Sequence, residues 1–133
     1  GADGGPWNRL CALPALWVGL LYDEEALNAA WDYVKDWTAE ERAQLRTDAA
    51  KHALKTPFRD RTLQEVAKDI LAIARGGLKR RARLNAHGEH EALFLDDLDE
   101  IARTGVSPAE RLIERYKGPW RESVEPVFEE AAY

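Results

Sequence analysis

The residues best suited to chemistry lie in the stretch LKTPFRD, at positions 54–60. Lys55 and Arg59 carry positive charges on either side of Pro57, whose ring stiffens the backbone between them. Two cations beside a rigid turn can hold a phosphate or a carboxylate. The alternative is a connector between two helices whose charges, Asp60 included, pair with one another. The spacing alone favours this alternative, because structural ion pairs are common.

Two other clusters contain side chains that bind metals. NAHGEHE, at 85–91, places His87 and His90 in a His-x-x-His spacing without a second pair of matched ligands, in a segment that resembles a loop. The acidic residues of 96–100 fit the solvent-facing side of a helix better than a Mg²⁺ site, although carboxylates do hold that ion. We therefore predict no metal site.

The remaining reactive residues indicate no complete active site. Cys11 lies among apolar residues, which predicts a buried and inert thiol. The tryptophans at 17, 31 and 37 follow helical positions and are expected in the core. GADGG, at 1–5, is the one glycine-rich segment that could line a pocket, and a frayed terminus explains it equally.

The composition limits the classes of function. A length of 133 residues predicts one domain, and a net charge of −5 disfavours nucleic acid, which requires a basic face. The single cysteine forms no internal disulfide and fits a reducing compartment, so we predict a cytoplasmic protein. The longest apolar run, LPALWVGLLY, is about half the roughly 20 residues that span a bilayer, so we expect no membrane partner.

Helix start signals recur along the chain. Asp23 is suited to cap a helix with glutamates in its first turn. Thr38 with Glu41, and Thr62 with Glu65, form capping boxes, in which the hydroxyl accepts from the third amide and the glutamate reaches back. Ser107-Pro108-Ala109-Glu110 adds proline at the first helical position and is the clearest of these signals.

These signals predict five or six helices and no confident strand. The expected helical segments are 16–37 with a second half from Asp23, one from Thr38 that ends before His52, one from Thr62 to the basic run 79–83, Ala92–Thr104, one from Ser107 to Gly118, and a short one from Ser123. Gly76-Gly77 is expected to weaken or kink the third of these segments. The prediction is an all-α fold that occupies residues 1–133 as a single helical region.

Five blocks of the sequence resemble one known family. GADGGPWNRLCALPALWVGLLYDE (1–24), DWTAEERAQLR (36–46), LKTPFRD (54–60), RTGVSPAE (103–110) and VEPVFEEAAY (124–133) are similar to the C-terminal portion of glutamate–cysteine ligases of the plant and proteobacterial type. The family pattern Glu-x-Arg-x-x-Asp would end at Asp3, with its Glu and Arg before Gly1. We therefore expect residue 1 to lie inside a longer protein, after a catalytic β-sheet portion of an α+β ligase.

The resemblance implies a substrate set and a reaction. Such ligases use ATP and Mg²⁺ to join the γ-carboxylate of glutamate to the amine of cysteine, in the first step of glutathione synthesis. The carboxylate is phosphorylated, and the amine then displaces phosphate. That chemistry needs a cradle for phosphates and metal-bound carboxylates, which we expect from the missing N-terminal portion. The 133-residue piece is expected to be inactive alone and to bind neither ATP nor Mg²⁺ tightly.

The resemblance also suggests roles for four residues of this chain. Asp3 would be catalytic, Trp7 would line the edge of the pocket, and Lys55 and Arg59 would contact an anionic substrate. Plant members are regulated by disulfides, and one cysteine makes no such bridge within this piece.

Two other readings stay open. The chain could be an autonomous helical interaction module without catalysis, or one part of a split ligase that works only with its complement. A large exposed apolar surface would favour a segment that packs on a missing portion, whereas a well-covered surface would favour the autonomous module.

Overall fold

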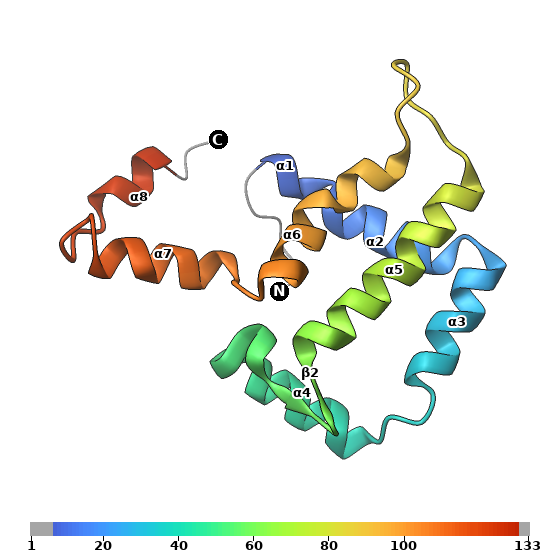
Figure 1. Ribbon diagram of the computed structural model, residues 1–133, viewed down its shortest axis with the longest axis horizontal. Coiled ribbons are helices and arrows are strands. Elements are labelled where there is room, and N and C mark those ends of the chain that lie inside the picture. Colours follow the sequence, from blue (N-terminus) through green and yellow to red (C-terminus); the bar gives the residue numbers. More distant parts are fainter. Residues whose placement is uncertain (1–6, 131–133) are drawn as a thin grey trace.

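The computed structural model describes the backbone of residues 7–130 and the side chains of residues 9–129. The elements are α1 (Trp7–Leu10), α2 (Ala12–Leu21), α3 (Glu24–Val34), α4 (Ala39–His52), the 3-10 turn η1 (Ala53–Lys55), β1 (Pro57–Phe58), β2 (Arg61–Thr62), α5 (Leu63–Arg81), the 3-10 turn η2 (Glu91–Leu95), α6 (Asp96–Thr104), α7 (Pro108–Lys117) and α8 (Glu125–Glu130). The long helix α5 runs through the middle of the body, with α2, α3 and α6 around it (Figure 1). The predicted helical fold is confirmed.

The predicted helix caps are present. The side chain of Asp23 accepts from the amide of Ala26 at 2.9 Å and begins α3. Capping boxes begin three further helices, with Thr38 and Glu41 at α4, Thr62 and Glu65 at α5, and Ser107 and Glu110 at α7. These caps form because each one joins residues three positions apart, so the local sequence suffices to specify it.

The core lies where α5 meets α2, η2 and α6. Its buried side chains are all apolar, and they are Ala15, Leu20, Leu71, Ala74, Leu78, Ala92, Leu95 and Ala102. Leu78 and Leu95 have no exposed surface. Four of these eight side chains are alanines, so the helices approach closely and few large side chains fill the centre.

Two glycines allow the backbones of α2 and α5 to touch. A Cβ atom added to Gly19 would lie 2.3 Å from the carbonyl oxygen of Ala74, and one added to Gly77 would lie 2.0 Å from the carbonyl oxygen of Gly19. Helix α5 continues through Gly76 and Gly77, and the expectation that these glycines weaken or kink it stays a prediction. Gly77 is required by the helix crossing, a contact between segments distant in sequence.

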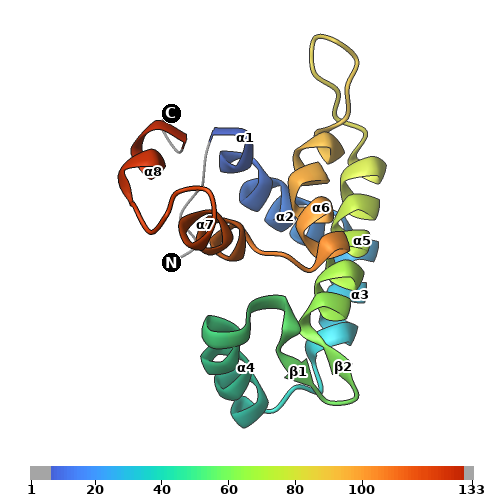
Figure 2. The same cartoon turned by 60° about the vertical axis from the view of Figure 1, so that its left-hand side comes forward.

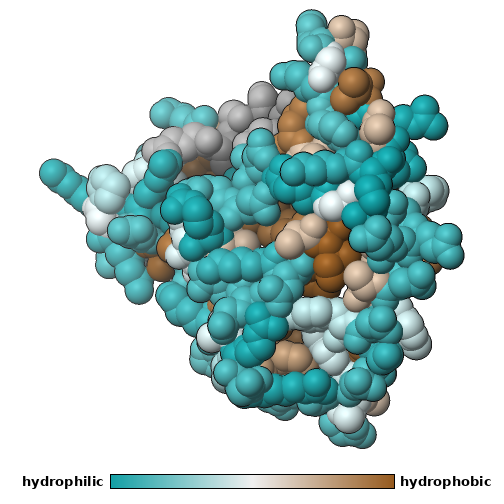
Figure 3. All heavy atoms as spheres, turned by 45° about the vertical axis from the view of Figure 1, so that its right-hand side comes forward, coloured by the Kyte–Doolittle hydropathy of each residue, from teal (hydrophilic) through white to brown (hydrophobic). Residues whose placement is uncertain are grey.

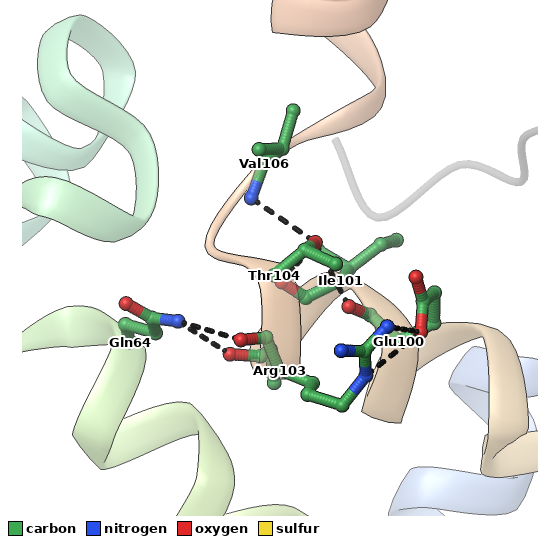
Figure 4. Close-up of polar contacts among 7 residues, drawn as sticks. Gln64, Glu100, Ile101, Arg103, Thr104 and Val106 are labelled. Atoms are coloured by element: carbon green, nitrogen blue, oxygen red, sulfur yellow. Dashed lines mark hydrogen bonds and ion pairs between the residues drawn. The ribbon is translucent and has the colours of Figure 1, made fainter.

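The end of α6 is held by a side chain from α5. The side-chain amide nitrogen (Nε2) of Gln64 donates to the carbonyl oxygens of Ala102 and Arg103 at 2.8 and 3.2 Å (Figure 4). Gly105 follows with φ +70°, in the left-handed conformation that ends many helices. Because carbonyls at a helix end lack partners within the helix, Gln64 both satisfies them and fixes α6 against α5.

An arm and a loop extend from this body. Helices α7 and α8 reach away from the other helices, and the segment between α5 and η2 projects at another corner (Figures 1 and 2). The projecting loop is closed by an isolated bridge between Leu84 and His90. Helix α7 leaves Leu112, Ile113 and Tyr116 exposed by 39%, 52% and 36%, although their spacing is that of an apolar helix face.

Several local expectations differ from the structure. Helix α4 ends at His52, later than predicted, and the segment expected to be helical from Ala92 opens with the 3-10 turn η2 before α6 begins. LKTPFRD contains the first strand and the turn of a short hairpin whose second strand is Arg61–Thr62, and period-two alternation does not reveal strands of two residues. Cys11 is exposed and not buried.

The tryptophan predictions are also partly wrong. Trp17 and Trp31 are 52% and 64% exposed, while Trp37 packs with Phe58 at a ring-centroid distance of 4.6 Å. A helical position fixes which residues share a face, but the neighbours in space decide whether that face is covered.

Candidate functional site

The candidate site is the hairpin that carries Arg59 in its turn, together with Lys55 at the end of η1 just before it. Strands β1 and β2 are antiparallel, pairing Pro57 with Thr62 and Phe58 with Arg61. Thr56 precedes them and is fully buried, with its hydroxyl donating to the carbonyl of Ala53 at 2.8 Å. This anchor and the buried Phe58 ring hold the hairpin on the body, so the charged residues on both sides of it have defined directions.

Arg59 turns toward the start of α4. Its Nε and Nη2 donate to the two carboxylate oxygens of Glu41 at 2.7 and 2.8 Å, and Nη2 also donates to the carbonyl of Asp36 at 2.9 Å. The hydrogen bond from Arg59, and then that from the amide of Thr38, lower the pKa of Glu41 to about 2. Arg59 has φ +55°, a conformation that favours glycine and costs an arginine about 1 kcal/mol. Its three hydrogen bonds offset that cost.

Lys55 turns toward the start of α7. Its Nζ lies 2.8 Å from Oε1 of Glu110, and its side chain is 74% exposed. The hydrogen bond from Lys55, followed by those from the backbone and side chain of Ser107, lowers the pKa of Glu110 to about 2. Both glutamates are third residues of capping boxes, so the two cations bind the starts of two different helices.

A third cation of this segment, Arg61, belongs to a network of hydrogen bonds with two other side chains. Arg61 pairs with Asp69 at 2.7 Å and donates to the hydroxyl of Tyr33 at 2.9 Å, and that hydroxyl donates to Asp69 at 2.8 Å. Burial, and then the hydrogen bond to Asp69, raise the pKa of Tyr33. The network joins α3, β2 and α5, and it neutralises Arg61.

The predicted site residues do not converge within the described part of the chain. Asp3 lies outside the described residues, and Trp7 begins α1 with a side chain that is also outside them. Lys55 and Arg59 lie at opposite ends of the hairpin and bind different glutamates. Sequence reasoning identified Glu41 and Glu110 as caps but missed them as partners of these cations, which lie 18 and 55 residues away.

The described residues do not fit Mg²⁺. Within residues 9–129, no three His, Cys, Asp or Glu side chains are grouped to hold a metal ion. In the acidic run, Asp96 pairs with Arg75 at 2.7 Å, Asp99 also pairs with Arg75, and Glu100 pairs with Arg103 at 2.6 Å. Carboxylates that already neutralise arginines are poor ligands for a divalent cation.

Fold and site together define a helical protein in which the cations of the candidate site, Lys55, Arg59 and Arg61, pair with carboxylates of other elements. A family model described as glutamate-cysteine ligase family 2 (GCS2) matches residues 1–130. The chain belongs to this family.

Sequence similarity to curated relatives extends over the whole chain. It is 56% identical over 133 residues to the chloroplastic glutamate–cysteine ligase of Arabidopsis thaliana, and 55% identical to that of Nicotiana tabacum. Identity to chloroplastic glutamate–cysteine ligase A of Oryza sativa subsp. indica is 51%. All of this chain is covered in each case, but only 24%, 24% and 26% of those proteins. The chain thus spans about a quarter of the length of these relatives.

The names of these relatives overturn one prediction. All three are called chloroplastic, so the predicted cytoplasmic location is wrong. A single cysteine indicates the redox state of a compartment and does not distinguish one reducing compartment from another. No helix among the described residues has the length and apolar character needed to cross a bilayer.

Proposed function

We propose that this chain is the helical C-terminal portion of an ATP-dependent glutamate–cysteine ligase. The reaction would join L-glutamate and L-cysteine with ATP to form γ-glutamylcysteine, ADP and phosphate, in the chloroplast as for its relatives. Residues 1–133 would form one helical region of that enzyme. The observation that carries the proposal is the family match over residues 1–130, together with 56% identity that extends over the full chain.

The pairing of charges in the structure favours a structural role for this portion of the enzyme. ATP and Mg²⁺ would be held by the remaining three quarters of the enzyme, because the described residues contain no group of His, Cys, Asp or Glu side chains that could hold the metal ion. We therefore assign no step of the reaction to the described residues. The chain alone is expected to be inactive.

Lys55 is the described residue best placed to contact an anionic substrate. Its side chain is 74% exposed and has one ion-pair partner, Glu110. Arg59 is 44% exposed and already donates to three acceptors, so it has less capacity for a ligand. Asp3 as a catalytic residue, and Trp7 as a residue at the pocket edge, remain proposals from the family resemblance.

The exposed apolar surface favours a ligase portion over an autonomous interaction module. Large apolar side chains are exposed on several elements, with Trp17 at 52%, Tyr22 at 69% and Phe128 at 77%. Apolar atoms also reach the surface of the largely hydrophilic face in Figure 3. An autonomous domain would cover such side chains, because contiguous apolar surface promotes association.

A chimera tests the proposed function. The matching quarter of the Arabidopsis thaliana ligase is replaced by residues 1–133, and ATP-dependent formation of γ-glutamylcysteine is measured. The control is the same ligase with that quarter deleted. We expect activity from the chimera and none from the deletion. A folded chimera without activity would contradict the proposal, as would a deletion that remains active.

A further inference from the structure

Helix α2 has an unusual composition for a helix at a surface. Its sequence, ALPALWVGLL, contains no charged residue, and the indole of Trp17 is its only polar side-chain group. Surface helices of globular proteins usually combine an apolar stripe with a polar face, and a helix that is apolar all round is normally covered on every side. The sequence of α2 is therefore that of an interior helix.

Within the described part of the chain, the buried residues of α2 lie on one side of the helix. Ala12, Ala15, Gly19 and Leu20 are buried, and α5 lies across this side (Figures 1 and 2). The opposite side carries three exposed residues at helical spacing, Pro14, Trp17 and Leu21, and exposed Leu10 at the end of α1 precedes them. We call these four residues the α2 stripe. Leu10, Trp17 and Leu21 are 39%, 52% and 49% exposed.

We infer that the α2 stripe packs against the three quarters of the ligase that this chain does not span. This inference rests on the proposed function. The curated relatives extend over about four times the length of this chain, so most of the fold of the family lies outside it. An apolar surface of that missing part would bury the side of α2 that α5 leaves exposed.

The size of the α2 stripe argues against a second copy of this chain as the covering partner. Its half-exposed side chains offer on the order of a few hundred Å², whereas a specific interface between separate proteins buries about 800 Å² on each side. Contact within one polypeptide avoids the loss of translational and rotational freedom that separate partners must overcome. A small apolar face is therefore sufficient for packing within one enzyme.

The experiment compares the same substitutions in two settings, the isolated chain and the chimera described above. The test variant is Trp17→Gln with Leu21→Gln. The matched control is Leu27→Gln with Trp31→Gln on α3, which removes the same two residue types at the same spacing from side chains that are 42% and 64% exposed. Thermal unfolding is followed by circular dichroism, and the mass of the isolated chain by light scattering.

In the isolated chain we expect both variants to stay within about 2 °C of the parent midpoint, because exposed side chains contribute little. In the chimera, the test variant should lower the midpoint by about 5 °C or more and the control by about 2 °C or less. The inference would be overturned if the test variant left the unfolding midpoint of the chimera unchanged. It would also be overturned if the control lowered that midpoint equally, or if the test variant lowered the midpoint of the isolated chain equally. So would a dimer of the isolated chain that the test variant dissociates.

The two proposals fail in different ways. If the chimera folds without ligase activity, the proposed function fails, whatever the unfolding midpoints show. If the chimera is active and the test variant leaves its midpoint unchanged, the packing of the α2 stripe fails and the proposed function stands.

Discussion

Arg59 binds Glu41 through two hydrogen bonds of 2.7 and 2.8 Å, and this contact joins the hairpin turn to the first turn of α4. Glu41 also accepts from the amide of Thr38 at 2.8 Å, so one carboxylate caps the helix and holds the hairpin. The contact neutralises one of the two cations that the sequence offers as a site for anions.

The Arg59–Glu41 contact makes the free energy of unfolding depend on pH in the acidic range. The pKa of Glu41 is lowered from 4.5 to about 2, so its stabilising contribution is fully present above about pH 4.5 and is lost as the pH falls toward 2. We expect Arg59→Gln to reduce this loss between pH 4.5 and 2 while lowering stability near pH 7, as measured by urea unfolding at each pH. The control is Arg46→Gln on the exposed face of α4, and an equal change in both variants would refute the prediction.

The helix crossing predicts opposite effects for two adjacent glycines. Gly77→Ala places a Cβ atom 2.0 Å from the carbonyl of Gly19, and we expect a loss of about 1–3 kcal/mol, as for overpacked cores. Gly76→Ala meets only the guanidinium of Arg80 at 3.4 Å, so a gain of up to about 1 kcal/mol is expected from helix propensity. Denaturant unfolding measures the free energy of unfolding of both variants. Equal changes in the two variants would contradict the close contact between α2 and α5 at Gly77.

The core predicts a strong dependence on Leu78. This side chain is fully buried, and Leu78→Ala should cost about 2–5 kcal/mol in the free energy of unfolding. Leu112→Ala on α7, where the leucine is 39% exposed, should change the same quantity by less than about 0.5 kcal/mol. Urea unfolding of the two variants checks this order, and a larger cost at Leu112 would show that the arm is packed differently.

The cap of α7 predicts a moderate effect at Ser107. Its hydroxyl accepts from the amide of Glu110 at 3.2 Å, and Ser107→Ala should cost about 1 kcal/mol. Ser107→Asp keeps an acceptor at the same position and should restore most of that stability. Amide hydrogen exchange over residues 108–117 measures the effect locally, and unchanged protection in Ser107→Ala would argue against the cap.

The proposed substrate contact predicts a kinetic effect at Lys55. A charge-assisted hydrogen bond contributes about 1.5–3 kcal/mol, so Lys55→Gln in the chimera should raise the KM for glutamate or for cysteine, both of which carry carboxylates, about tenfold or more. Lys51→Gln, which removes an exposed lysine at the end of α4, is the control. An unchanged KM for both substrates would leave Lys55 with its structural ion pair alone.

The sequence by itself determined the helical class of the fold and the starts of four helices. The caps at Asp23, Thr38, Thr62 and Ser107 are confirmed, because each one depends on backbone and side-chain groups three residues apart. The family was also recognisable, since its blocks extend over the whole chain.

Only the tertiary structure decided which faces are covered and which charges meet. Gly77 lies at a helix crossing, Trp17 is exposed, and Arg59 and Lys55 reach glutamates 18 and 55 residues away. The physical reason is that local sequence fixes the direction of a side chain on its own element. Whether that direction leads to a carboxylate, to another backbone or to solvent depends on how distant elements pack.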